Sequence, residues 1–101
     1  MKTVVLGDKY TVLLFSFAGL EGRIVENEAQ AIEQVKDIRR NKEYGLMIVT
    51  ERIAQWANTW INKTRFSKSN LLIVEVPDRS GHIETGKSLS DFIREAVGIR
   101  I

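Results

Sequence analysis

Polar residues stand directly after three apolar runs of this sequence, where a parallel α/β sheet would hold a ligand. Gly7-Asp8-Lys9 follows the first run, Thr50-Glu51 the third and Pro77-Asp78 the last. The carboxyl ends of parallel strands meet at one end of the sheet, so these groups are expected close together. A phosphoacceptor domain would need a carboxylate pair after the first run and an acceptor Asp after the third, but the chain has one Asp and a Thr there. These residues therefore disfavour a phosphoacceptor. A receiver-like signalling domain and a small-ligand binder are kept as alternatives.

Other kinds of active site lack their residues. The chain has no cysteine and a single histidine, His82, within a polar segment. Thiolate metal sites, thiol nucleophiles and most zinc or triad chemistries therefore lose their side chains. The turn at Gly7 also lacks the further glycines that let a backbone approach a pyrophosphate. We expect no catalytic residue, no metal and no cofactor, and we interpret Asp8 as the cap of the helix that follows it.

Length and composition predict a single soluble domain. The 101 residues are 44% hydrophobic and 28% charged, which is typical of a folded globular chain. The net charge of +2 is too small to indicate a nucleic-acid surface. The longest apolar stretch, residues 12–18, is less than half of a membrane span. We therefore expect a cytoplasmic protein that does not insert into a membrane.

Short apolar runs alternate with segments of helical periodicity. The runs predict four strands, at residues 3–6, 23–26, 46–49 and 71–76. The first helix is expected at residues 10–18 and ends at Gly19, a residue that tolerates a left-handed cap. Two further helices should begin after the capping residues Asn27 and Thr50, with Gln30 completing a capping box at the first of them.

Apolar stripes show which faces of these helices should pack against a core. The stripes are Ala31, Ile32, Val35 and Ile38 in the second helix and Ile53, Ala57, Trp60 and Ile61 in the third. Gly45 is expected to break the chain before the third strand. Residues 77–87 predict a polar loop. Residues 88–101 predict an amphipathic helix, capped by Ser88, and a short tail.

Strands that alternate with helices in this way indicate right-handed parallel crossovers and an α/β fold. We predict a truncated flavodoxin-like (receiver-like) three-layer domain with a four-stranded parallel sheet of order 2-1-3-4 and helices on both faces. The second and third helices should cover one face, and the first and last the other. Residues 1–101 should form a single domain whose body is residues 1–76. The first helix is apolar nearly all round, which suggests that a partner covers part of it.

Two groups of residues have both a packing and a binding interpretation. Trp56 and Trp60 are one helical turn apart, and they either complete the core or anchor a partner. Two basic runs are interpreted as solvated helix faces near helix C-termini, with a docking site for acidic groups as the alternative. The runs are Lys36, Arg39, Arg40 and Lys42, followed by Lys63, Arg65 and Lys68.

Four segments, in order along the chain, resemble one family. They are Val5-Leu6-Gly7-Asp8-Lys9 with Phe15, Ala18 and Gly19; residues 45–54; Ile73-Val74-Glu75-Val76-Pro77-Asp78; and the stretch from Ser88-Leu89 to Glu95-Ala96-Val97-Gly98-Ile99. Their combination resembles the F-subunit family of V-type and archaeal A-type rotary ATPases. Lys87 and the loop Arg79-Ser80-Gly81-His82 depart from the family pattern, so contacts of that loop are not carried over.

The resemblance implies a non-catalytic component of a central stalk. In that family, the F subunit is a small α/β domain bound to the coiled-coil D subunit of the rotor. The pair turns inside a ring of catalytic A and nucleotide-binding B subunits and couples ATP hydrolysis or synthesis to proton or sodium transport. The C-terminal helix of the family reaches toward the catalytic head and modulates its activity. The implied location is cytoplasmic and peripheral to the membrane.

Eight apolar residues are the partner contacts expected under this resemblance. One face of the body would grip the D subunit, and the last helix would bias the rotor between coupled and less coupled states. The residues are Phe15, Ala18, Trp56 and Trp60 in the body and Leu89, Phe92, Ile93 and Val97 in the last helix.

Overall fold

Strands and helices alternate along the part of the chain that the structure, a computed structural model, describes: residues 2–67 and 70–77. In chain order the elements are β1 (Lys2–Gly7), α1 (Lys9–Ser16), β2 (Glu21–Ile24), α2 (Glu28–Arg40), β3 (Tyr44–Thr50), α3 (Glu51–Trp56), α4 (Asn58–Phe66) and β4 (Leu72–Val76). The predicted polar loop after Pro77 and the predicted last helix lie outside the described residues.

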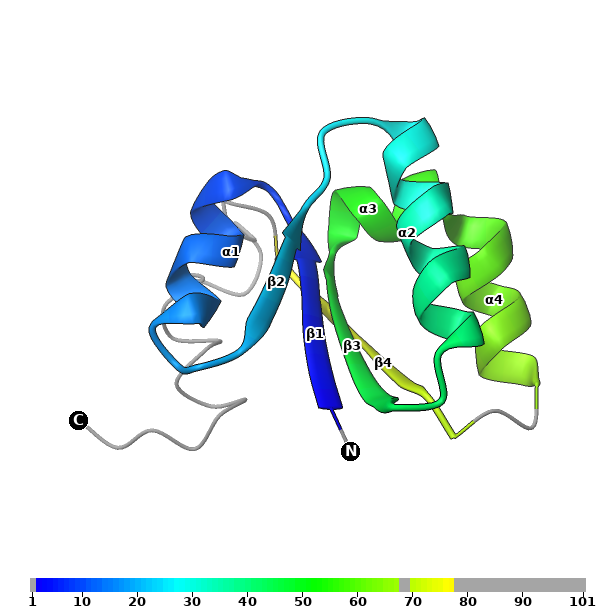
Figure 1. The fold of residues 1–101 in the computed structure, drawn as a ribbon. Coiled ribbons are helices and arrows are strands. Elements are labelled where there is room, and N and C mark those ends of the chain that lie inside the picture. Colours follow the sequence, from blue (N-terminus) through cyan, green and yellow to red (C-terminus); the bar gives the residue numbers. More distant parts are fainter. Residues whose placement is uncertain (1, 68–69, 78–101) are drawn as a thin grey trace.

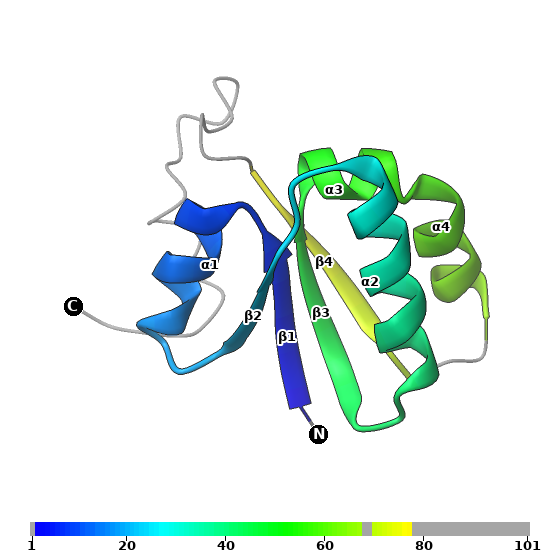
Figure 2. The same cartoon turned by 45° about the horizontal axis from the view of Figure 1, so that its top comes forward.

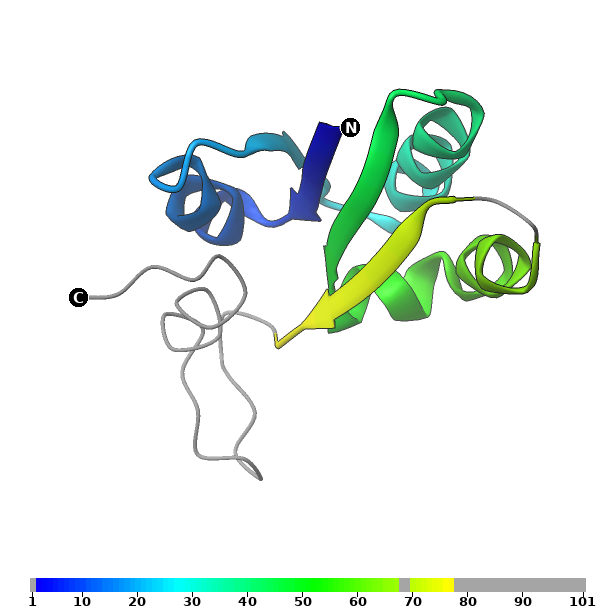
Figure 3. The same cartoon turned by 90° about the horizontal axis from the view of Figure 1, so that it is seen from below.

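The strands form one parallel sheet in the order β2-β1-β3-β4. This confirms the predicted α/β fold and strand order. Helix α1 lies on one face of the sheet, and α2, α3 and α4 lie together on the other (Figure 1). Two rotated views show the same division, with the sheet as the middle of three layers (Figures 2 and 3).

Alternate residues of the central strands supply two separate cores, because neighbouring side chains of a strand point to opposite faces. Val4 and Leu6 of β1 pack with the stripe of α2 and with residues of α3 and α4 in the larger cluster. Val5 of β1 packs with Phe15 of α1 in the smaller cluster. Burying a side chain such as Phe15 stabilises the fold by about 1.5–3 kcal/mol, so each layer is held mainly by its apolar face.

Three helices begin at the capping residues that the sequence predicts. Asp8 caps α1, Asn27 caps α2 and Thr50 caps α3, each by accepting a backbone N–H three residues later. Gln30 donates its N–H to Asn27 at 2.9 Å, and its side-chain oxygen accepts the backbone N–H of Glu26. The reciprocal bond therefore reaches the residue before Asn27, one position earlier than in the capping box that we expected.

Gly45 lies at an irregularity in the pairing of β1 with β3, and Gly22 lets α1 approach β2 closely. Lys2 pairs with Tyr44 and Thr3 with Leu46, so Gly45 is an extra residue in β3 at the edge of this register shift. The prediction that Gly45 precedes the strand is therefore wrong: it lies within β3, at an irregularity of the kind glycine commonly marks. A Cβ on Gly22 would lie 2.5 Å from Val12 Cγ1, so the absent side chain lets α1 pack directly on β2.

Two predicted boundaries are also corrected. Strand β2 begins two residues earlier than expected, at Glu21, and ends at Ile24, because its first residues, Glu21 and Gly22, carry no apolar signal. The single helix expected after Thr50 is two helices that meet at Ala57, whose φ of −105° and ψ of 27° depart from helical values. Asn58 and Thr59 follow this break, and both are weak helix formers because their side chains compete for backbone hydrogen bonds.

Candidate binding surfaces

The polar residues at the carboxyl ends of β1 and β3 are used to begin helices. Asp8 Oδ1 accepts the backbone N–H of Thr11 at 2.7 Å, which confirms the interpretation of Asp8 as a cap. Thr50 is 3% exposed, and its Oγ1 accepts the N–H of Ile53 at 3.3 Å. Asp78, the third polar group expected here, lies outside the described residues. The geometry at β1 and β3 thus favours helix capping over a phosphoacceptor site.

Close packing also fills the space beside Gly7. A Cβ on Gly7 would lie 2.9 Å from both Cβ and Cγ2 of Thr11, so the threonine side chain occupies the place of the missing one. Thr11 is fully buried, and its Oγ1 has no hydrogen-bond partner among the described residues. The first turn of α1 therefore sits tightly against the end of β1, where a nucleotide-binding member of this fold class would need room for phosphates.

Metal-ligating side chains are scattered over the described residues, 2–67 and 70–77. Within these ranges, no three His, Cys, Asp or Glu side chains gather in a way that could hold a metal ion. None of the helices described there combines the length and the hydropathy needed to span a membrane. His82, the histidine considered as a base or ligand, is not among the described residues.

The outer side of α1 carries an exposed apolar surface, which we call the α1 stripe: Tyr10, Leu13 and Phe17. Their exposed fractions are 41%, 52% and 79%. Tyr10 and Leu13 are in α1 and Phe17 is its C-terminal capping residue, so the three follow the i, i+3, i+7 spacing of one helix face. These three residues were not among the expected partner contacts, although their spacing in the sequence could have predicted that they share one helix face.

The sheet face on the α1 side continues as an apolar surface beyond the helix. Leu72 of β4 pairs with Leu46 of β3, and Val74 pairs with Ile48, which belongs to the core under α1. Aligned residues of neighbouring strands share a face, so Leu72 and Val74 point to the α1 side. They are 67% and 37% exposed. Among the described residues, this side of the body is therefore more apolar than a solvated face requires. It is the face that the predicted last helix, which lies outside the described residues, was expected to share with α1.

The structure places the expected partner contacts in three different situations. Phe15 is fully buried in the core under α1, whereas Ala18, just after that helix, is half-buried. Trp56 and Trp60 are half-buried and pack against the larger core. The four expected contacts in the last helix lie outside the described residues: Leu89, Phe92, Ile93 and Val97.

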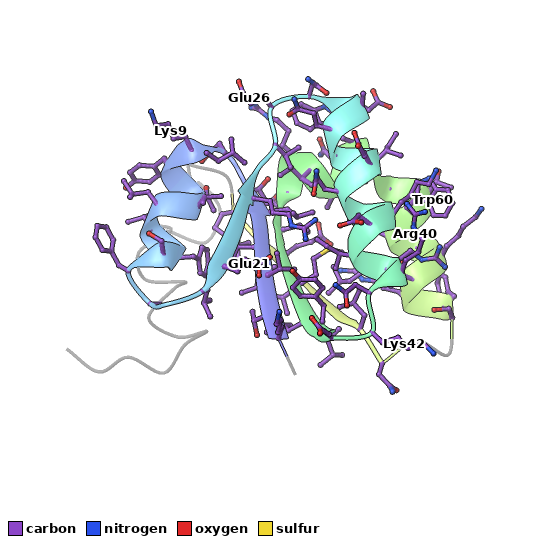
Figure 4. All side chains as sticks on the ribbon, viewed as in Figure 1. Lys9, Glu21, Glu26, Arg40, Lys42 and Trp60 are labelled. Carbon is purple, nitrogen blue, oxygen red and sulfur yellow. The ribbon has the colours of Figure 1, made fainter. Side chains whose placement is uncertain are left out.

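Trp60 also lies among three cations from two helices. Lys36 and Arg39 of α2 approach its ring, with Lys36 Nζ 5.0 Å and Arg39 Cζ 5.2 Å from the centroid. Lys63 of α4 approaches as well, with Nζ at 4.7 Å. The two basic runs, separate in the sequence, thus meet at one aromatic side chain. In Figure 4, Trp60 and Arg40 lie on the same outer side of the helical layer.

A polar network joins β2 to α2 around Arg23. Its guanidinium donates to Asp37 Oδ2 and Gln34 Oε1, each at 2.7 Å, and to the Tyr44 hydroxyl at 3.2 Å. That hydroxyl in turn donates to Glu21 at 2.6 Å. The hydrogen bond from Arg23 lowers the pKa of Asp37 below its ordinary value, and the bond with Asp37 raises the pKa of Arg23. The network therefore keeps both groups charged.

These features define a class of protein before any comparison. The described part is a parallel α/β domain in which residues at the strand ends cap helices, with an exposed apolar stripe on α1 and a group of cations around Trp60. Residues 3–97 match the family described as ATP synthase (F/14-kDa) subunit. The chain belongs to this family.

Individual relatives agree with that assignment. The chain is 33% identical over 100 residues to a protein of Methanocaldococcus jannaschii named as the F subunit of an A-type ATP synthase, covering 98% of this chain and 97% of that one. Proteins of the same name from Thermococcus sibiricus and Methanothermobacter thermautotrophicus are 34% and 32% identical, covering 100% and 96% of this chain and 98% and 92% of theirs. These matches confirm the family resemblance of the sequence.

Proposed function

We propose that this chain is the non-catalytic F subunit of a V/A-type rotary ATPase and acts in its central stalk. It binds the coiled-coil D subunit and turns with it inside the ring of catalytic A and nucleotide-binding B subunits. Its role is mechanical: it helps to couple ATP hydrolysis or synthesis to proton or sodium transport. The chain would then be peripheral to the membrane, on the cytoplasmic side, through the assembled complex.

The observation that carries this proposal is the exposed α1 stripe on a member of this family. A helix face with Leu13 and Phe17 half or more exposed is costly in water and suits contact with another helix. Leu72 and Val74 extend the apolar surface on the same side of the sheet. A coiled coil offers the long apolar and polar ridges against which such a surface can pack.

The partner contacts expected from the sequence are carried forward with different roles. Phe15 supports α1 from within, so its side chain would shape the contact without touching the partner. Ala18 lies at the end of the same helix, close in sequence to Phe17. Trp56 and Trp60 are on the opposite layer. Leu89, Phe92, Ile93 and Val97 belong to the C-terminal segment, which we propose modulates the catalytic head.

Co-purification with a recombinant D subunit tests the proposal. The Leu13→Ser, Phe17→Ser double variant should bind the D subunit about thirtyfold to several hundredfold more weakly, because anchor residues at interfaces each contribute about 1–2 kcal/mol. Dissociation constants can be measured by calorimetry, with circular dichroism to verify that both chains remain folded.

Phe66→Ser is the matched control, because Phe66 is 88% exposed at the end of α4, on the other layer. It should bind the D subunit like the unaltered chain. Equal weakening by both variants, or none by the double variant, would remove the α1 stripe from the contact. Failure of the unaltered chain to bind the D subunit would overturn the proposed function itself.

A further inference from the structure

The cations around Trp60 form a distinct surface, which we call the Trp60 cluster: Lys36, Arg39, Lys63 and the Trp60 ring. The first two come from the last two turns of α2 and the third from the last turn of α4, so the cluster bridges two packed helices. All three charged groups lie within 5.2 Å of the ring centroid. A cation on an indole face is attracted by the ring, but three cations together also repel one another.

These cations differ from others of the molecule in their pairing. Lys2 lies 3.1 Å from Glu43, Arg23 lies 2.7 Å from Asp37 and Arg65 lies 3.2 Å from Glu75. Across residues 2–67 and 70–77, no carboxylate lies within ion-pair distance of the three cations of the Trp60 cluster. The helix dipoles of α2 and α4 offset part of their charge, yet a concentrated positive surface remains.

A cavity of about 400 Å³ adjoins the cluster at the base of the helical layer. Arg39 belongs to both, and the cavity is also lined by Ile38, Asn41, Lys42, Tyr44, Asn70 and Leu71. Figure 4 shows Lys42 toward the lower end of this side of the molecule. A lining that combines cationic, amide-bearing and apolar residues matches a segment that carries both carboxylates and an apolar side chain.

We propose that the surface formed by the Trp60 cluster and this cavity binds an acidic segment of a partner protein. Carboxylates of the segment would pair with Lys36, Arg39 and Lys63, and an apolar side chain would pack on the exposed part of Trp60. Trp and Arg are the residues that most often dominate protein interfaces, and here they adjoin. This inference does not depend on the proposed function, since it concerns the opposite layer from the α1 stripe.

Phosphate-bearing partners fit the surface less well. The three cations stand near helix C-termini, whose negative dipole ends disfavour every anion, and a doubly charged phosphate group more than a singly charged carboxylate. Phosphates are typically held at helix N-termini by backbone N–H groups. Glu33 and Asp37 interrupt the basic run of α2, and the net charge of the chain is +2, so the positive field is confined to one small area. Single carboxylates spread along a peptide suit that field better.

A fluorescence titration tests the proposal on the full chain. In a Trp56→Phe background, Trp60 is the remaining tryptophan and reports binding at the cluster directly. The probe is a synthetic helical peptide with Glu at every fourth position and Leu at positions between them. The control peptide has Gln in place of each Glu. We expect the Glu peptide to shift the Trp60 emission and the Gln peptide to bind at least about tenfold more weakly. Binding should also weaken as salt is raised from about 0.1 to about 1 M, because the screening length falls from about 10 to about 3 Å.

Two matched charge variants separate a site from a general attraction. Lys36→Gln, Arg39→Gln, Lys63→Gln should lose about tenfold or more in affinity for the Glu peptide. Lys2→Gln, Lys9→Gln, Arg65→Gln removes the same number of charges elsewhere and should bind within about twofold of the unaltered chain. Thermal unfolding verifies that both remain folded.

Three outcomes would overturn the proposal. Equal weakening by the two charge variants would show that net charge alone attracts the peptide. Equal affinity for the Glu and Gln peptides would show that carboxylates are not recognised. If inorganic tripolyphosphate or single-stranded RNA displaced the Glu peptide at a concentration below that of the peptide itself, the surface would be assigned to phosphate-bearing ligands instead.

Discussion

Two buried hydroxyl groups at the carboxyl ends of β1 and β3 have different roles. Thr11 and Thr50 are both buried beside Gly7, but their hydroxyls differ. Thr50 Oγ1 caps α3, whereas Thr11 Oγ1 has no hydrogen-bond partner within residues 2–67 and 70–77. A buried hydroxyl without a partner costs about 1–3 kcal/mol of stability, while a capping hydroxyl contributes about 1 kcal/mol. The methyl group of Thr11, which contacts Gly7, is the part that the packing uses.

This contrast predicts opposite effects of one substitution. Thr11→Val keeps the shape and removes the unpartnered hydroxyl, so the free energy of unfolding should rise by about 1 kcal/mol. Thr50→Val removes the cap of α3 and should lower it by about 1 kcal/mol. Urea unfolding followed by tryptophan fluorescence measures both. A loss of stability in Thr11→Val would mean that its hydroxyl has a partner in solution.

Residue types predicted local structure well where the signal was short-range. Asp8, Asn27 and Thr50 are caps because a polar side chain and the N–H that it accepts lie three residues apart. Phe15 was the harder case. We expected it as a partner contact, and the structure places it in the core under α1, because periodicity alone cannot tell which side of an apolar helix faces the sheet.

At the scale of elements, the Arg23 network joins the edge strand β2 to helix α2. Strand β2 has four residues and pairs only with β1 among the described strands, so few backbone bonds hold it. The bonds from Arg23 to Gln34 and Asp37 tie this short strand to α2. Since Arg23 lowers the pKa of Asp37, part of the attachment depends on pH.

The acid stability of the chain should therefore depend on Asp37. A carboxyl whose pKa is lower in the folded state contributes stability above its unfolded pKa and loses it as pH falls through the folded value. Asp37→Asn should be less stable than the unaltered chain at pH 7, and the difference should shrink below about pH 4. Denaturant unfolding at several pH values measures it. Glu33→Gln, on an exposed position of the same helix, is the control, and a difference that stays constant from pH 7 to pH 3 would contradict the assignment.

Element order and the sheet were predictable because continuous apolar runs such as residues 46–49 are typical of buried parallel strands. The break at Ala57 and the irregularity at Gly45 were not, since both depend on how neighbouring elements pack. The Trp60 cluster was missed for a similar reason. Its cations lie 27 residues apart in the sequence, from Lys36 to Lys63, and only the packing of α2 against α4 brings them together.

At the scale of the whole molecule, two different surfaces lie on opposite faces of one sheet. Helix α1 and the layer of α2, α3 and α4 lie on opposite faces of the sheet (Figure 1). The α1 stripe is exposed and apolar, and cations gather around Trp60 in the other layer. A body of this form can contact two partners at once, because neither surface overlaps the other. The proposed contact with a coiled coil and the acidic docking surface are therefore compatible in one assembly.

The proposed regulatory role of the C-terminal segment is also a property of the assembly. Deleting residues 88–101 should change the ATPase activity of a reconstituted complex, by about fivefold for a coupling free energy of about 1 kcal/mol. Binding to the D subunit should persist, because the α1 stripe remains. Phosphate release by complexes with full-length and truncated chains measures the effect. Unchanged activity in a complex of normal composition would refute the regulatory role.

The outer edge of β2 has a consequence for how this protein behaves at high concentration. Exposed strand edges are where foreign strands add and fibrils grow, and proteins suppress this with short edges and charged residues. Strand β2 has both defences, since its four residues include Glu21 and Arg23. A crowding copy would find few backbone groups to pair with there. Misassembly into amyloid-like stacks is therefore disfavoured at this edge, and contacts with partner proteins are expected at the helical layers instead.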